Sequence, residues 1–207
     1  MPFIAFCCIV VDPPATIYMG KDKFENEDLI KYGFEEDVWF HVDNLSSAHV
    51  YLRMNPGQTW DNLPEALLED LAQLTKANSI TGNKQDNITV IYTSWGNLLK
   101  NQSMATGQVS FKSSKRVKKV FVKERINSVV NRLNKTKVEK FPDFAKMKVD
   151  NNKERSRLKN KEMQAKRLQK KQLSRQAVVE KENSSYDRVF ESAQMKKSHN
   201  SDFDDFI

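Results

Sequence analysis

The distribution of aromatic residues most constrains what this chain can fold into, because aromatic side chains supply much of the apolar area that a core buries. All three tryptophans lie before Phe144, and no aromatic residue occurs between Phe144 and Tyr186. We therefore predict a folded domain over residues 1–145, a segment without its own core over residues 146–182, and a disordered tail over residues 183–207.

The charge of the chain changes sign along its length. Residues 1–100 have a net charge of −7, whereas residues 101–145 and residues 146–182 each have a net charge of +8. The predicted tail has a net charge of −2. An acidic body joined to two basic stretches indicates a polyanion as the binding partner.

The N-terminal apolar run gives expectations about compartment. It spans residues 3–11, which is too short to cross a bilayer, and it lacks a basic leader and a small-residue cleavage site. No transmembrane segment or signal peptide is expected. Cys7 and Cys8 are adjacent within the run and are predicted to be buried, so no disulfide framework is expected. These features predict a cytoplasmic protein, with the nucleus as the alternative.

Strands and helices are predicted in an irregular order. Hydrophobic patterning and turn residues predict strands over residues 3–11, 16–19, 37–42, 48–53 and 88–92. Residues 108–111 and 117–122 are predicted to pair as a hairpin. Because strands and helices do not alternate regularly, the predicted class is α+β, with a compact mixed sheet and a few helices.

Three helices are predicted within the domain. The first is short, capped by Asn26 and ended by Gly33 in the left-handed conformation. The second begins at Asp61 or Asn62, with Pro64 just inside it, and runs to about residue 78. The third carries apolar residues at helical spacing from residue 126 and ends before Pro142.

Residues 146–182 contain good helix formers and neither Pro nor Gly, which predicts a long charged helix. Its heptad columns are only half filled with apolar residues, which favours a single helix or a weak coiled coil. Such a helix can order on an anionic partner, or it can hold a protein partner. An acidic-aromatic end, SDFDDFI, closes the chain.

The most polar cluster of the domain lies within residues 37–49. Strand alternation would place Asp37, Trp39, His41 and Asp43 on one face. Ser46, Ser47 and His49 follow shortly after them along the chain. Two alternatives to ligand contact are considered. One is a metal-dependent hydrolase that uses Asp37, His41 and His49, and the other is a structural role in stabilising the turn at residues 44–47. One strand face supplies few metal ligands, so we expect no catalytic residue, no metal and no cofactor. Trp39 and Trp95 are candidate base-stacking platforms, although core packing is the more common role of such residues.

A run of six cations without an intervening acid occupies residues 112–123, and it consists of Lys112, Lys115, Arg116, Lys118, Lys119 and Lys123. Phosphate binding, protection of a sheet edge and a nuclear import signal are three uses of such a run. No glycine pattern for cradling phosphate and no CxxC motif occurs, so nucleotide hydrolysis is not expected.

Several long strings resemble one family, and they are TIYMGKDKFENEDLIKYG (16–33), DVWFHVDNLSSAHVYLR (37–53), KANSI (76–80), VIYTSWGNLLK (90–100), GQVSF (107–111) and RLNKTKVEKFPDF (132–144). They are similar to the coiled-coil domain-containing protein 25 family, whose members look like stand-alone NFACT-R domains followed by a charged helical tail.

The resemblance implies a nucleic-acid-binding α+β domain whose larger relatives work with RNA and the large ribosomal subunit. The family motif maps onto Asp37, Trp39, His41, Ser46, Ser47, Ala48 and His49. With Arg53 and the six cations of residues 112–123, these residues form the predicted nucleic-acid-binding site. The expected function is a non-enzymatic nucleic-acid or ribonucleoprotein adaptor, with RNA or ribosomal particles favoured over DNA, and a protein-interaction scaffold acting through residues 146–182 is the alternative.

Overall fold

The structure is a computed structural model that describes residues 3–141 and 143–201. Within the last stretch, the side chains of residues 182, 184, 185, 187, 188 and 191–201 lie outside the description. The chain divides into two units, Met1–Asn151 and Asn152–Ile207. The first unit holds the sheet and the candidate site, and the second belongs to the long helix α4 (Phe144–Ser201).

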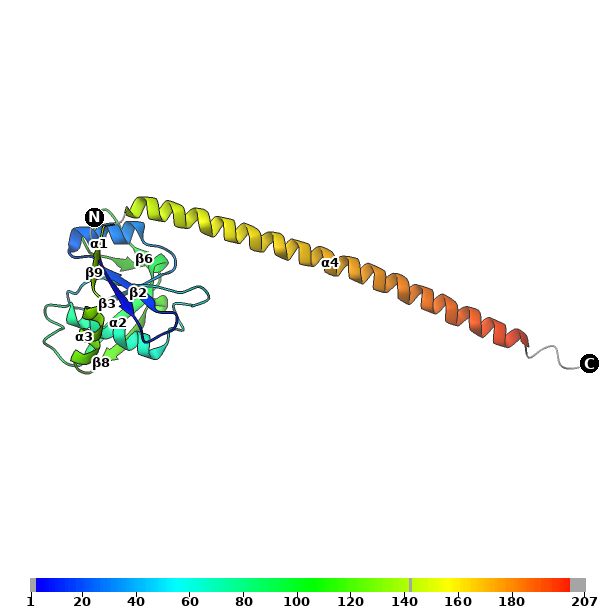
Figure 1. The fold of residues 1–207 in the computed structure, drawn as a ribbon, viewed down its shortest axis with the longest axis horizontal. Coiled ribbons are helices and arrows are strands. Elements are labelled where there is room, and N and C mark those ends of the chain that lie inside the picture. Colours follow the sequence, from blue (N-terminus) through cyan, green and yellow to red (C-terminus); the bar gives the residue numbers. More distant parts are fainter. Residues whose placement is uncertain (1–2, 142, 202–207) are drawn as a thin grey trace, which may run out of the picture. The chain divides into compact units, whose positions relative to one another are not determined.

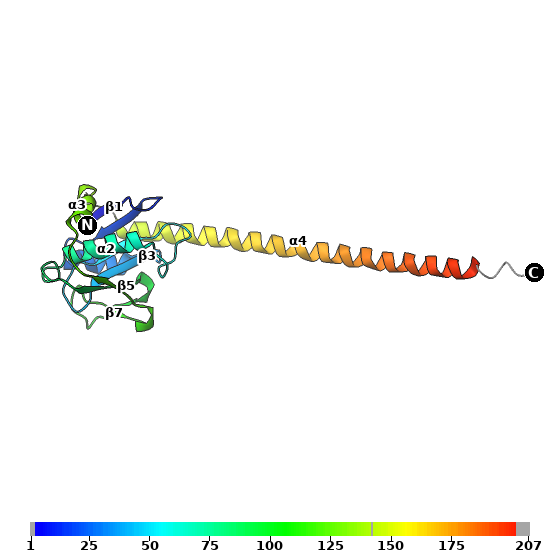
Figure 2. The same cartoon turned by 90° about the horizontal axis from the view of Figure 1, so that it is seen from below.

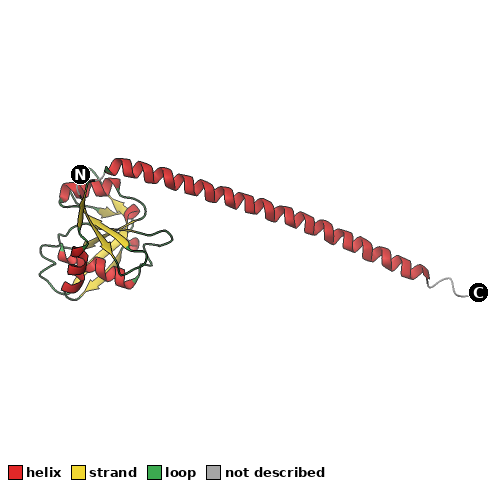
Figure 3. Ribbon diagram, viewed as in Figure 1, coloured by secondary structure: helices red, strands yellow, loops and turns green. Residues whose placement is uncertain are grey.

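Within the described residues, the first unit is built on a seven-stranded antiparallel sheet with the order β8-β5-β3-β4-β2-β1-β9. Its strands are β1 (Phe3–Cys8), β2 (Ala15–Met19), β3 (Asp37–Val42), β4 (Val50–Arg53), β5 (Ile88–Ser94), β8 (Lys118–Val122) and β9 (Val138–Lys140). A separate pair joins β6 (Leu98–Leu99) to β7 (Ser110–Phe111). The predicted α+β class is confirmed (Figure 3).

Helices cover both faces of the sheet (Figures 1 and 2). On one face lie α2 (Glu65–Ala77) and α3 (Asn127–Lys135), and Leu67 and Leu71 of α2 pack with Val38 and Phe40 of β3. On the other face, α1 (Lys23–Tyr32) and the β6-β7 pair cover a second cluster that includes Trp39. Full burial of a leucine or phenylalanine contributes about 1.5–3 kcal/mol, so this two-sided packing supplies most of the stability that positions the site.

The structure corrects several local predictions around α1. Its N-cap is Asp22 rather than Asn26, because the Asp22 carboxylate accepts the backbone N–H groups of Phe24 and Glu25. Gly33 ends α1 with a φ of −56°, so it is not left-handed. The glycine is needed for another reason: a Cβ at this position would lie 2.2 Å from Nε1 of Trp95.

Strand pairing also differs from the prediction. Residues 108–111 and 117–122 do not form a hairpin, because β7 pairs with β6 and β8 pairs with β5. The helix predicted from residue 126 ends at Lys135, and the chain then forms β9 on the edge beside β1. Cys8 is buried as predicted, whereas Cys7 is exposed because it lies on the opposite face of β1.

The long helix α4 begins one residue before the end of the predicted domain. Its first residues belong to the first unit, where Phe144 packs against Phe3 with ring centroids 5.5 Å apart. The helix continues to Ser201, past the boundary predicted at residue 182. Residues 202–207 of the predicted tail and Pro142 lie outside the described residues. No described helix has an apolar stretch that could cross a membrane.

Candidate nucleic-acid interface

Asp37 is a structural anchor at the start of β3. Its carboxylate is fully buried and accepts hydrogen bonds from the Tyr18 hydroxyl at 2.5 Å, the Phe34 backbone N–H at 2.7 Å and the Arg53 Nε at 2.5 Å. Arg53 lies opposite Asp37 in the β3-β4 register, and its guanidinium stacks over the Phe34 ring at 3.9 Å. The burial of Asp37 corrects the expectation of direct ligand contact: Asp37 positions its neighbours instead.

The buried Trp39 ring contacts the rings of two histidines, His41 and His49. Its side chain is 2% exposed, and its Nε1–H donates to Nδ1 of His49 at 2.9 Å. The His41 ring stacks on the Trp39 ring with centroids 5.4 Å apart and an interplanar angle of 5°. A base cannot stack on a ring that is already covered in this way. Trp39 is therefore a positioning residue rather than the stacking platform that we considered.

Trp95, the other candidate platform, is also engaged by the domain itself. Its Nε1–H donates to the Ile30 carbonyl at 2.9 Å, and Nζ of Lys148 lies 4.4 Å from the ring centroid. Lys148 also donates to the Lys31 carbonyl at 2.8 Å. These contacts fasten the first turns of α4 to the body and leave Trp95 with a structural role.

The two imidazoles are held neutral by their surroundings. His49 accepts a hydrogen bond on Nδ1, so that nitrogen carries no proton. Burial is the main cause that lowers the pKa of His49, to about 3, and the nearby His41 and Lys100 lower it further. Burial also lowers the pKa of His41, against the opposing effect of its hydrogen bond to the Val42 carbonyl. Because a carbonyl only accepts, Nδ1 of His41 is the donor at 2.7 Å, which leaves Nε2 as an acceptor.

The lowered pKa of His49 predicts a pH dependence of stability. The unfolded histidine binds a proton below its ordinary pKa of 6.5, whereas the folded one does so only near 3. The contribution of His49 to the free energy of unfolding is therefore complete above pH 6.5 and falls as the pH drops towards 3. His49→Gln keeps an acceptor for Trp39. It should reduce the slope of the free energy of unfolding against pH by up to about 1.4 kcal/mol per pH unit.

Urea unfolding of the wild type and the His49→Gln variant between about pH 4.5 and 7.5 measures this difference. His41, whose pKa is also lowered, is present in both proteins. It accounts for part of the pH dependence of stability that remains in the variant. Parallel stability curves for the two proteins would contradict a neutral, buried His49.

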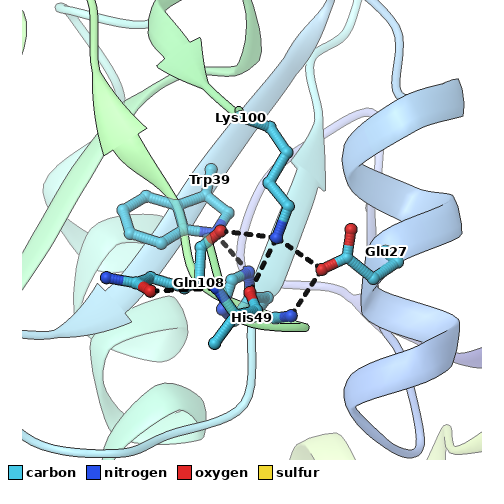
Figure 4. Close-up of polar contacts among 7 residues, drawn as sticks. Glu27, Trp39, His49, Lys100 and Gln108 are labelled. Atoms are coloured by element: carbon cyan, nitrogen blue, oxygen red, sulfur yellow. Dashed lines mark hydrogen bonds and ion pairs between the residues drawn. The ribbon is translucent and has the colours of Figure 1, made fainter. Parts of the chain in front are cut away.

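A lysine and a glutamate hold a loop over His49 (Figure 4). Nζ of Lys100 donates to the Glu27 carboxylate at 2.6 Å and to the carbonyls of Ala105 and Gln108 at 2.8 and 2.9 Å. The same carboxylate accepts the Gly107 backbone N–H at 2.5 Å. Sequence reasoning missed Glu27 and Lys100, because residues 73 positions apart have no local signal that joins them.

A polar groove of about 630 Å³ lies beside the histidines, and we call it the α1 groove. It is lined by Ile4, Met19, Gly20, Lys21, Asp22, Lys23, Asn26, His41, Ser46, Ser47, Ala48, His49, Asn78, Ile80, Thr106, Gly107 and Lys137. Four of the predicted site residues therefore meet in one place. The exposed cations Lys21, Lys23 and Lys137 join them, although no local pattern in the sequence marks these three lysines.

The serines of the motif shape the wall of the α1 groove. Oγ of Ser47 accepts the Val42 backbone N–H at 3.0 Å and donates to the Ala48 carbonyl at 3.1 Å. The carbonyl of Ser46 accepts from Oγ of Ser79, whereas the Ser46 side chain is exposed. Asn44 makes the turn possible with a φ of 60°, a value that asparagine tolerates better than most residues.

The six cations of residues 112–123 are divided between the two faces of the sheet. Lys119 lies in register with Ile91 and His41, so it shares the face of the histidines, where it pairs with Asp43 at 2.8 Å. The remaining contacts go to neutral groups. Lys112 donates to the Gly96 carbonyl, Lys118 to the Asp61 carbonyl and Arg116 to the Ser94 hydroxyl.

Both Arg116 and Lys118 approach the Trp60 ring, at 5.7 and 5.8 Å from its centroid, on the side of the sheet that α2 covers. Lys115 and Lys123 are exposed. Among the described residues, only Lys119 of this run forms an ion pair with a carboxylate. The run therefore keeps most of its charge available, but it does not form a single surface with the histidines.

The described residues contain no group of three or more His, Cys, Asp or Glu side chains that could hold a metal ion. In the hypothetical hydrolase site, Asp37 is neutralised by Arg53, and Nδ1 of His49 is occupied by Trp39. These contacts occupy two of the three side chains on which such a hydrolase site would depend.

Comparison with known proteins identifies the family of the domain. Residues 4–113 match the family described as "NFACT protein RNA binding domain". The chain belongs to this NFACT-R family.

Named relatives share most of the chain. Coiled-coil domain-containing protein 25 of Danio rerio is 57% identical over 149 residues, which cover 72% of each chain. Its Bos taurus counterpart is 51% identical over 76% of each chain. Protein JLP2 of Saccharomyces cerevisiae is 48% identical, covering 62% of this chain and 63% of that protein.

A solved structure shares the fold. The C-terminal part of the fibronectin/fibrinogen-binding protein from Streptococcus suis superposes with a TM-score of 0.51 at 17% identity. The match covers 65% of this chain and 48% of the other. The NFACT-R fold is thus found well beyond close sequence relatives.

Proposed function

We propose that this protein is a non-enzymatic adaptor that binds single-stranded RNA in the α1 groove and gains affinity from its other cations. The observation that carries the proposal is the meeting of His41, Ser46 and Ser47 with three exposed lysines in one groove. Ammonium groups grip phosphates, whereas fixed polar groups can contact sugars and bases.

Two features favour RNA over DNA. The family that the chain belongs to is described as RNA-binding. In addition, the neutral His41 presents an acceptor nitrogen, which a ribose 2′-hydroxyl or a base amino group can satisfy. Ribosomal RNA is one source of such strands, and we propose ribosomal particles as the cellular partner.

The run at residues 112–123 and the basic part of α4 supply electrostatic attraction in this proposal. Most of their cations are exposed, and contacts of this kind act on any phosphate backbone without reading its sequence. They would raise the rate of association and the affinity, whereas the α1 groove would determine what is held.

The proposal is tested by measuring the affinity of the full chain for labelled RNA and DNA 12-mers of one sequence at about 50–300 mM salt. If about six phosphates are neutralised, the logarithm of the affinity should fall with a slope near −4 against the logarithm of the salt concentration. RNA should bind more tightly than DNA at each salt concentration. An affinity that does not respond to salt would overturn the proposal.

A protein partner for α4 is the second candidate function, and one observation favours it. Val178, Val179, Tyr186, Val189 and Phe190 are all exposed. At 100° per residue they fall within an arc of about 120°, which makes one apolar stripe. Sedimentation analysis of the full chain at physiological salt, with and without Tyr186→Glu, would show whether this stripe drives self-association.

A further inference from the structure

The edge of the sheet at β8 offers a second binding surface that the proposed function does not use. Strand β8 is the last strand on its side, with β5 as its only neighbour among the described strands. An edge strand presents unpaired backbone groups that can accept a further strand. Natural proteins often guard such an edge with lysines, and β8 carries Lys118 and Lys119, so a strand that pairs here must suit their charge.

The register shows which backbone groups of β8 are open. The Asp43 N–H donates to the Thr89 carbonyl at 2.8 Å, so the backbone groups of Thr89 face β3. Backbone groups alternate between the two sides of a strand, so those of Val90 face β8, and Val90 with Val120 is a hydrogen-bonded pair. The N–H and C=O groups of Lys119 and Phe121 therefore point away from β5, and within the described part of the chain they have no backbone partner.

An apolar groove of about 540 Å³ lies where the side chains of an added strand would fall, and we call it the β8 groove. Val120 and Val122 form one wall, and Leu68 and Ala72 of α2 form the other, with Ile126 at one end. Leu68, Val120 and Ile126 are only partly buried although they pack against the main core. A further strand would complete that packing.

Charge selects the occupant. Lys119 and Phe121, which is 64% exposed, alternate with Val120 and Val122 along β8, and together with Lys123 they contribute to the rim of the β8 groove. A second copy pairing through its own β8 would bring like charges together, which is how edge lysines prevent self-association. On the groove side, Glu65 and Glu69 line the rim and disfavour acidic residues there.

We propose that β8 binds an extended segment of a partner protein by strand addition, with apolar side chains in the β8 groove and acidic side chains beside Lys119 and Lys123. Backbone hydrogen bonds to Lys119 and Phe121 provide the affinity, and the alternation of apolar with acidic residues provides the selectivity.

The probe is a dye-labelled peptide of alternating Val and Glu, titrated onto the full chain by fluorescence anisotropy. A Val/Lys peptide of the same length is the charge control. The acidic peptide should bind at least about tenfold more tightly, because the basic one faces Lys119 and Lys123. Equal binding of both peptides, or no binding of the acidic one, would overturn the proposal.

Two changes test the backbone contact. Phe121→Pro removes an N–H that points away from β5, so the pairing with β5 is kept. It should weaken peptide binding about tenfold, whereas Phe121→Ala, which keeps the N–H, should weaken it less than about threefold. If the proline variant fails to fold, peptides N-methylated at alternate residues report on the wild type. N-methyl groups on the peptide residues whose N–H groups face β8 should abolish binding, and N-methyl groups on the alternate residues should not. Equal effects of the two methylation patterns would contradict strand addition.

RNA binding by the Phe121→Pro variant separates this site from the α1 groove. The RNA affinity should be unchanged when peptide binding is lost. A parallel loss of RNA affinity would assign the β8 edge to the nucleic-acid interface and overturn the peptide proposal. If the wild type binds the peptide but does not bind RNA, the proposed function alone is contradicted.

Discussion

Replacement of Asp37 by alanine is expected to lower the free energy of unfolding by about 3–5 kcal/mol. The substitution leaves the Arg53 guanidinium without its carboxylate, and the Tyr18 hydroxyl and the Phe34 N–H lose their acceptor. Asp37 is fully buried, so water cannot replace the lost bonds without entering the core. Urea unfolding followed by circular dichroism at neutral pH measures the loss.

Asp43→Ala is the matched control for Asp37→Ala. Asp43 also carries a salt bridge, at 2.8 Å to Lys119, but the lysine side chain is 64% exposed. An exposed pair contributes about 0–1 kcal/mol, so the control should remain close to the wild type. If the two variants lose equal stability, burial is not what makes the Asp37 network important, and its positioning role is contradicted.

Neutralisation of the three groove lysines, as Lys21→Gln, Lys23→Gln and Lys137→Gln together, is expected to reduce RNA affinity about 50-fold near 0.15 M salt. The reason is the loss of about three phosphate contacts, each with a slope of about −0.7 for a single strand. The slope of affinity against salt should accordingly become shallower by about 2. Fluorescence anisotropy with an RNA 12-mer across a salt series gives both quantities.

A second triple variant controls for charge alone. Lys112→Gln, Lys115→Gln and Lys123→Gln remove the same net charge from the basic run, all from exposed side chains. We expect a smaller loss of affinity, because these cations act by general attraction. If the run variant loses as much affinity and slope as the groove variant, the α1 groove is not the interface.

Local patterns predicted the central strands and helix α2 close to their positions in the structure, and they predicted the start of α3 but not its end. Strand β3 was expected over residues 37–42 and is found there, because its β-branched and aromatic residues suit a strand buried on both faces. The leucine stripe of α2 was also visible, since helical spacing and packing against a sheet require the same periodicity.

Features that depend on distant partners were not predictable. Residues 117–122 look like half of a hairpin, yet β8 pairs with β5, which lies far from it along the chain. Strand β9 exists because β1 offers a free edge, and its own three residues carry little strand signal. The cap of α1 was misplaced because Asp22 and Asn26 are both good capping residues, and tertiary contacts bury Asn26.

The candidate site shows the same division. The order of amino acids alone determined that a polar motif lies on one face of β3 and that a basic half follows an acidic body. It also determined that the chain belongs to a family described as RNA-binding. The tertiary structure decided the roles: it buried Asp37 and Trp39, brought three lysines to His41, and divided the basic run between two faces. The physical reason is that burial and charge proximity arise from contacts across the sheet, and no local pattern encodes which strands become neighbours.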